Sequence, residues 1–143
     1  MSKPALGWSL HEKIPSSLDV GHATIERLMA ALEANQWEGR DLFHIQLAIE
    51  EAIVNAITHG NKLADDKVVE VEFRVDPNTT FMRIKDQGAG FNPADIPDPT
   101  DDDHLECTNG RGVMLIREFM SEVRYNDRGN EVTMIKHRSK EEA

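Results

Sequence analysis

The chain has 143 residues, of which 39% are hydrophobic and 29% are charged, as in ordinary soluble globular proteins. This length predicts one domain, residues 1–143, with a single core. The formal net charge of -10 argues against direct DNA or RNA binding, which draws on Lys and Arg that neutralise phosphates. A small phosphate ligand is not excluded, because backbone N–H groups and a bound cation can hold one.

The sequence also indicates the compartment. No stretch approaches the roughly 20 apolar residues that a membrane-spanning helix needs. The first residues lack the apolar core of a signal peptide, and the single cysteine, Cys107, has no partner for an internal disulfide. We therefore expect a cytosolic protein without a membrane segment.

The first half of the chain predicts one strand and two helices. Residues Trp8–Ile14 alternate enough for an opening strand, and a helix follows over about Val20–Asn35, capped by either Ser17 or Asp19. A second helix begins near Asp41 and ends at Gly60. Its apolar residues recur at helical spacing along one side: Leu42, Ile45, Ile49, Ala52, Ile53 and Ala56.

The second half predicts two hairpins and a third helix. Residues Val68–Val75 and Phe81–Lys85 are strands joined by the turn Asp76–Thr79. An irregular loop and an amphipathic helix follow, and the chain ends in a second hairpin: residues 92–106, then 113–120, then 123–126 and 132–137 around the turn 127–129. Helices segregated from a mostly antiparallel sheet predict an α+β two-layer sandwich.

The first candidate group for chemistry lies on the second predicted helix. Glu51, Asn55 and His59 follow one another at intervals of four residues, so their side chains stack on one face of an α-helix. A carboxylate and an amide one turn apart can accept a proton from a nucleophile and hold a divalent cation. Taken alone, the same spacing is also typical of a solvated helix face.

Two glycine-containing segments come later. Asp86-x-Gly88-x-Gly90 follows a predicted strand, where a carboxylate can accept a hydrogen bond from an amino group such as that of adenine. Gly110-Arg-Gly112 precedes a predicted helix, whose free N–H groups favour a phosphate. An ordinary turn is the alternative explanation for the first segment, and Gly-x-Gly alone is common.

In this order and spacing, the three segments resemble the N, G1 and G2 boxes of the GHKL ATPase superfamily, over about residues 47–136. Within that superfamily the chain looks most like the anti-sigma-factor serine/threonine kinases of the RsbW type, on segments Glu51–Asn61 and Gly129–Lys136. The resemblance implies the Bergerat fold, a two-layer sandwich with a mostly antiparallel sheet and three helices.

The resemblance also implies two cofactors, ATP and Mg²⁺, and a role for each matched residue. Glu51 matches the general base, Asn55 the magnesium ligand and Asp86 the carboxylate that binds adenine. The other matched positions are glycines beside the base, glycines around the phosphates and a mobile lid: Gly88, Gly90, Gly110, Gly112 and residues 92–109. We add Arg111 as a phosphate contact. Asn130 departs from the pattern, since many relatives have threonine there.

The implied function is a protein serine/threonine kinase that phosphorylates a STAS-type anti-anti-sigma protein and holds a sigma factor inactive. Relatives of this size are often dimers, so a homodimer is expected as well. Two alternatives remain open: a non-catalytic nucleotide-gated module that sequesters a partner, and an ATP hydrolase with no protein acceptor. Glu51 favours the kinase over the binding module, because a module needs no general base.

Overall fold

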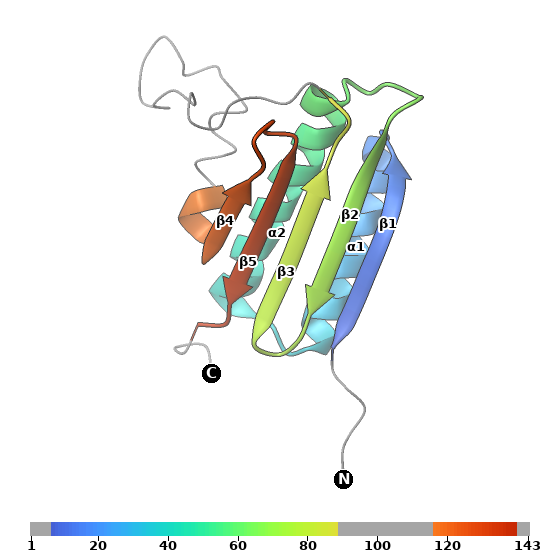
Figure 1. Cartoon of the computed structure of the whole chain (residues 1–143). Coiled ribbons are helices and arrows are strands. Elements are labelled where there is room, and N and C mark those ends of the chain that lie inside the picture. The colour runs from blue at the N-terminus through green and yellow to red at the C-terminus, as the bar shows by residue number, and fades with distance from the viewer. Residues whose placement is uncertain (1–6, 89–115, 140–143) are drawn as a thin grey trace.

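The computed structural model describes residues 7–88 and 116–139, and their elements form a sheet covered on one face by helices (Figure 1). The strands are β1 (Trp8–Pro15), β2 (Val68–Val75), β3 (Thr79–Lys85), β4 (Glu122–Tyr125) and β5 (Glu131–His137). The helices are α1 (Leu18–Ala34), α2 (Gly39–Val54) and the π-helix η1 (Asn55–Gly60), and residues 116–119 are also helical. The strand order is β1-β2-β3-β5-β4, and every pair is antiparallel. The predicted α+β sandwich is confirmed.

The core lies between the sheet and the helices because each strand alternates in burial. In β2, Val69, Val71 and Phe73 are fully buried, while the residues between them are not. Burying one such side chain contributes about 1.5–3 kcal/mol. The helices supply the opposite side of the core with residues at helical spacing: Ile25, Leu28 and Leu32 from α1, and Ile45, Ile49 and Ile53 from α2.

Ser17, not Asp19, caps the first helix. The Ser17 backbone is extended, with φ -124° and ψ 126°, and its hydroxyl accepts a hydrogen bond from the Val20 N–H at 3.3 Å. Asp19 lies inside the first turn, where its negative charge interacts favourably with the helix dipole. The two residues named as alternatives therefore both stabilise this helix end, in different ways.

The second helix changes geometry before it ends. Regular α-helix stops at Val54, and η1 is closed by the Asn61 N–H, which donates to the Ala56 carbonyl five residues back at 2.8 Å. The Thr58 hydroxyl donates to the Val54 carbonyl at 2.7 Å, where the α-helical pattern is interrupted. Single π turns of this kind are frequent at functional sites.

This change corrects one prediction. Glu51 and Asn55 are separated by one regular turn, as predicted, but His59 lies within η1. The predicted α-helix is therefore corrected to a π-helix from Asn55 onward, while a step of four residues still stays close to one helix face. The predicted end at Gly60 is confirmed, and the start lies at Gly39, two residues before the predicted one.

The turn between β2 and β3 explains why β3 begins earlier than predicted. The Asp76 carboxylate accepts hydrogen bonds from the N–H groups of Asn78 at 2.7 Å and Thr79 at 2.8 Å. These bonds close the turn early, so β3 begins at Thr79 and not at Phe81. Thr80 is fully buried although it is polar, and for this reason the apolar pattern alone placed the strand start too late.

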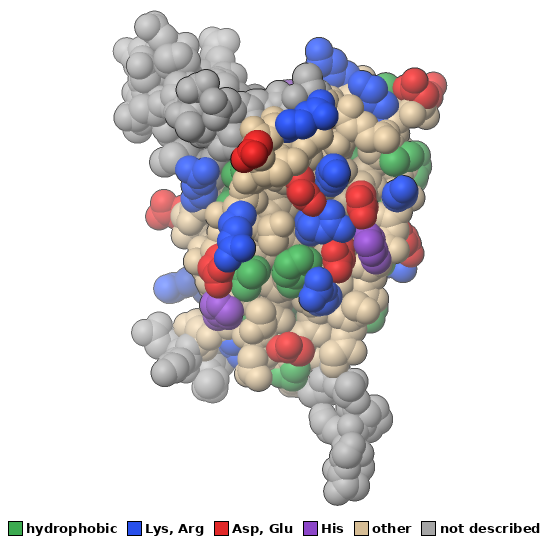
Figure 2. Space-filling model, viewed as in Figure 1, with side chains coloured by type: hydrophobic (Ala, Val, Ile, Leu, Met, Phe, Trp, Pro, Cys, Tyr) green, Lys and Arg blue, Asp and Glu red, His purple; other side chains and the backbone are tan. Residues whose placement is uncertain are grey.

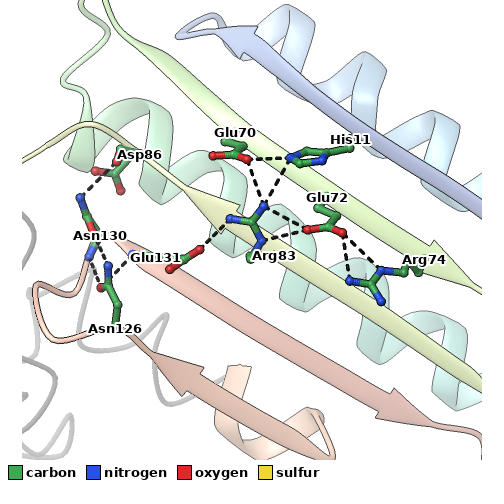
Figure 3. A network of polar contacts seen from close by, with 9 residues as sticks. All are labelled: His11, Glu70, Glu72, Arg74, Arg83, Asp86, Asn126, Asn130 and Glu131. Carbon is green, nitrogen blue, oxygen red and sulfur yellow. Dashed lines mark hydrogen bonds and ion pairs between the residues drawn. The ribbon is translucent and has the colours of Figure 1, made fainter.

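The face of the sheet away from the helices carries intermixed positive and negative side chains (Figure 2). At its centre, Arg83 on β3 forms ion pairs with Glu70 at 3.0 Å, Glu72 at 3.0 Å and Glu131 at 2.7 Å (Figure 3). Hydrogen bonds from His11 and then from Arg83 lower the pKa of Glu70 to about 2. The network joins β1, β2, β3 and β5 side by side.

Candidate functional site

Asn55, the first residue of η1, has a buried side-chain oxygen that needs a hydrogen-bond donor or a metal ion. Its Oδ1 is buried and has no hydrogen-bond partner among residues 7–88 and 116–139. Leaving a buried acceptor unpaired costs about 1–3 kcal/mol. An amide oxygen is also the kind of hard ligand that Mg²⁺ binds. Asn55 therefore fits the predicted metal position.

Asp86 directly follows β3. Its Oδ1 accepts a hydrogen bond of 2.7 Å from the Gly88 N–H, while Oδ2 has no hydrogen-bond partner in the described part of the chain. Burial raises the pKa of the Asp86 carboxyl, although the Gly88 N–H and the positive charges of Lys67 and Arg128 act in the opposite direction. The result is a half-buried carboxylate with one oxygen that accepts no hydrogen bond from residues 7–88 or 116–139.

The end of η1 touches the loop that begins at Asp86. A Cβ atom added to Gly60 would lie 2.6 Å from Asp86 Oδ1 and would overlap the rest of that carboxyl group. A Cβ added to Gly88 would overlap the Gly60 carbonyl and lie 3.0 Å from Asp86 Oδ1. The end of η1 at Gly60 and the segment Asp86–Gly88, far apart in the sequence, therefore meet where only glycine fits.

Replacing Gly60 by alanine is expected to lower the free energy of unfolding by about 1–3 kcal/mol, because the new methyl group overlaps the Asp86 carboxyl group, one oxygen of which is held by the Gly88 N–H. Urea titration followed by circular dichroism measures the change. Gly7→Ala is the matched control, since a Cβ there would make only an ordinary contact of 3.6 Å with the Val75 carbonyl. Equal stability of both variants would contradict the close approach.

Asn61 holds the same loop from the helix side, a role that sequence reasoning missed. Its side chain is fully buried, and Oδ1 accepts a hydrogen bond from the Gln87 N–H at 2.7 Å. Its Nδ2 donates to Ser16 Oγ and to the Val68 carbonyl, each at 2.9 Å. The only sequence signal was an asparagine after a helix-ending glycine, which is equally typical of an ordinary loop.

Asn126 and Asn130 hold the loop from the sheet side. Asp86 N donates to the Asn130 carbonyl at 2.9 Å, and the Asn130 side chain donates back to the Asp86 carbonyl at 3.2 Å (Figure 3). Gly129 between them has φ 75°, a left-handed conformation that favours glycine. The predicted turn at residues 127–129 is present, and Asn130 forms hydrogen bonds at the position where the sequence departs from the expected pattern.

The charge of Glu51 acts on Tyr125, a residue of β4. Burial raises the pKa of Tyr125 to about 12, and the Glu51 carboxylate adds to this rise while Arg117 opposes it. The Arg117 guanidinium lies 5.7 Å from the centre of the Tyr125 ring. Glu51 on α2 is thus electrostatically close to β4 and to the helical residues 116–119.

The other predicted site residues are not placed by the structure. Gly90, Gly110, Arg111 and Gly112 lie outside the described residues, as does the predicted lid at residues 92–109. The start of the third predicted helix, at residues 113–115, also lies outside them. Within the described ranges, no helix is long and apolar enough to cross a membrane, and no group of three or more His, Cys, Asp or Glu side chains could hold a metal.

Residues 14–136 match the family described as the histidine kinase-like ATPase domain, which takes in both predicted site segments of the described chain. The chain belongs to this family. Its predicted GHKL resemblance, carried by Glu51, Asn55, Asp86 and the glycines, is confirmed at the level of the family.

Individual relatives within this ATPase family carry two kinds of name. An anti-sigma F factor of Anoxybacillus flavithermus is 32% identical over 109 residues, 72% of this chain and 74% of that protein. An anti-sigma F factor of Bacillus velezensis is 28% identical over 126 residues, 84% of each chain. A serine-protein kinase RsbW of Listeria monocytogenes is 28% identical over 103 residues, 65% of this chain and 64% of that protein. The match therefore spans slightly less than two thirds of the Listeria kinase.

Proposed function

We propose that this protein is an ATP-dependent serine/threonine protein kinase that acts as an anti-sigma factor and phosphorylates a STAS-type anti-anti-sigma protein. Membership of the histidine kinase-like ATPase family supports the use of ATP. The names of the relatives, anti-sigma F factor and serine-protein kinase RsbW, support both the kinase activity and the sigma-factor partner. The activity and its partners are carried over from these names and from the site.

The observation that carries the proposal is the half-buried Asp86 carboxylate at the end of β3. One of its oxygens is held by the Gly88 N–H at 2.7 Å, and the other has no partner in the described residues. A fixed carboxylate of this kind accepts a hydrogen bond from the amino group of adenine and rejects bases that lack a donor there. Gly60 and Gly88 let η1 and the loop approach closely around this carboxylate.

The reaction requires a base beside the acceptor hydroxyl. In the proposed step, the serine oxygen of the partner attacks the γ-phosphorus of ATP, and the bond from that phosphorus to the β-phosphate oxygen breaks. ADP leaves, and the Glu51 carboxylate accepts the proton of the serine hydroxyl. Positioning and electrostatic stabilisation supply most of the rate in phosphoryl transfer, and the base adds roughly 10²–10⁴-fold.

Magnesium and the phosphates have proposed contacts of their own. Asn55, through its buried unpaired Oδ1, would hold Mg²⁺, which neutralises phosphate charge when it is bound. Gly88 and Gly90 would lie beside the base, and Gly110, Arg111 and Gly112 would contact the phosphates, with residues 92–109 as the lid. These positions come from the match to the family motifs.

Replacing Asn55 by alanine is expected to weaken ATP binding in the presence of Mg²⁺ by at least roughly tenfold, since the metal loses a protein ligand. Calorimetric titration with ATP, with and without Mg²⁺, measures the effect. Asn35→Ala is the matched control, because Asn35 Oδ1 is also buried without a partner among the described residues but lies at the C-terminal end of α1. An unchanged dependence on Mg²⁺ in Asn55→Ala would contradict the metal role.

Phosphotransfer separates the kinase from its alternatives. Purified protein is mixed with radiolabelled ATP and a STAS protein from the same organism, and label on the STAS protein and free phosphate are both counted. Label on a serine supports the kinase. Free phosphate without label indicates an ATP hydrolase, and ATP binding with neither product indicates a nucleotide-gated binding module.

A further inference from the structure

Asn130 has every polar group of its main chain and side chain in a hydrogen bond within the site. Its carbonyl accepts from the Asp86 N–H at 2.9 Å, and its side-chain Nδ2 donates to the Asp86 carbonyl at 3.2 Å. Its N–H donates to Asn126 Oδ1 at 3.0 Å, and its Oδ1 accepts from Asn126 Nδ2 at 2.6 Å. The residue is only 7% exposed. Hydrogen bonds therefore hold all four of its polar groups.

These partners also determine the orientation of both side-chain amides. Asn130 Nδ2 faces a carbonyl, which can only accept, so the amide cannot be reversed there. Asn126 Oδ1 faces the N–H groups of Asn130 and Glu131, at 3.0 Å and 3.2 Å, which can only donate. Asn126 thus holds Asn130 in the one orientation that contacts Asp86, as Figure 3 shows.

These contacts lie just beyond the end of the paired part of β3 and β5. The regular pairing of β3 with β5 ends at Lys85 and Glu131, one residue before Asp86. Beyond that point the Asp86 main chain is held on both its N–H and its carbonyl by the same residue, Asn130. The Asp86 main chain is the base from which its side chain extends, so these bonds, together with the one from the Gly88 N–H to Oδ1, restrict where the carboxylate can point.

We propose that Asn130, held by Asn126, is a positioning residue that aims the Asp86 carboxylate at the amino group of the bound base. This inference rests on the proposed function, in which Asp86 binds adenine. A threonine hydroxyl can donate one hydrogen bond and accept another, but only from a single oxygen, whereas Asn130 uses two separate atoms, Nδ2 and Oδ1, for these contacts. The two asparagines therefore work as a pair in this chain.

The test compares two nucleotides that differ at the position Asp86 contacts. ATP has an amino group on the base, and inosine triphosphate has a carbonyl oxygen in its place. The dissociation constants of both are measured by calorimetry with Mg²⁺ for the wild type, Asn130→Ala and Asn126→Ala. We expect the preference for ATP, the ratio of the two constants, to fall by roughly 3- to 10-fold in each variant, as for one weakened hydrogen bond.

A purely structural role would weaken both nucleotides equally and leave this ratio unchanged. Asn35→Ala serves as the control for general destabilisation, because Asn35 is 2% exposed and its Nδ2 likewise donates to a main-chain carbonyl, that of Ala31 at 2.8 Å. Asn126→Ala keeps the main-chain bond between Asp86 and Asn130, so it remains informative if Asn130→Ala does not fold.

Each outcome decides a different point. A wild-type protein that binds ATP and inosine triphosphate equally well, or binds neither, overturns the adenine role of Asp86 and with it this inference. A wild type that prefers ATP, with variants that keep the full preference, overturns the inference alone and leaves the proposed function in place. A fall in preference in the asparagine pair but not in Asn35→Ala supports it.

Discussion

Replacing Glu51 by glutamine is expected to reduce phosphotransfer to the partner roughly 10²–10⁴-fold, because the amide cannot accept the serine proton. ATP binding should change little, since the proposed nucleotide contacts lie on other residues. The rate is measured in a single turnover, with enzyme in excess over radiolabelled ATP and saturating partner. The dissociation constant for ATP is measured in parallel, so that a loss of binding is not mistaken for a loss of chemistry.

Glu50→Gln is the matched control for Glu51→Gln. Glu50 is the adjacent residue on α2, about 100° around the helix axis from Glu51, and its carboxylate accepts a side-chain hydrogen bond from Gln46 at 3.4 Å. Both substitutions remove one negative charge, and they lie at adjacent positions of the same helix. If Glu51→Gln transfers phosphate at the wild-type rate, Glu51 is not the base. If both variants lose activity alike, the effect is one of helix charge.

The sheet was predictable because its strands alternate in burial over most of their length. The predicted range of β2 agrees with the observed one, as its apolar residues occupy every second position. The boundary errors arose where polar residues are buried, as at Thr80, or where a side chain closes a turn, as at Asp76. The π geometry of η1 was not predictable, since six residues are too few to separate two helical periods.

The candidate site was predictable only at residues whose side-chain type and place in the sequence pattern both indicate a chemical role. A carboxylate after a strand, such as Asp86, is a recognisable feature, and so is an acid four residues before an amide. The supporting asparagines are not, because Asn61 and Asn126 follow a helix end and a strand end, where asparagine is common for local reasons. Gly60 was interpreted as a helix stop, while its second role depends on a contact with Gly88 that only the fold brings about.

Replacing Asp86 by asparagine is expected to weaken ATP binding by at least roughly 100-fold, since the amide places a donor against the amino group of the base. The free energy of unfolding, in contrast, should stay the same or rise. Burial raises the pKa of Asp86 in the folded state, so the folded protein binds its proton more tightly than the unfolded chain does, and stability is lost as pH rises through that pKa. At neutral pH the variant should therefore be as stable as the wild type or more so.

The same raised pKa gives ATP binding a pH dependence that Asp86→Asn should remove. Because the Gly88 N–H occupies Oδ1, a proton on the carboxyl group sits on Oδ2 and faces the amino group of the base, so wild-type affinity falls as pH decreases through a value above the usual pKa of an aspartate. The ratio of the two proteins' dissociation constants cancels the titration of ATP itself, and it should approach one as pH decreases. Asp66→Asn, at an exposed position, is the charge control. A stabilised Asp86→Asn variant that still binds ATP normally at neutral pH would mean that this buried carboxylate serves a purpose other than recognising the base.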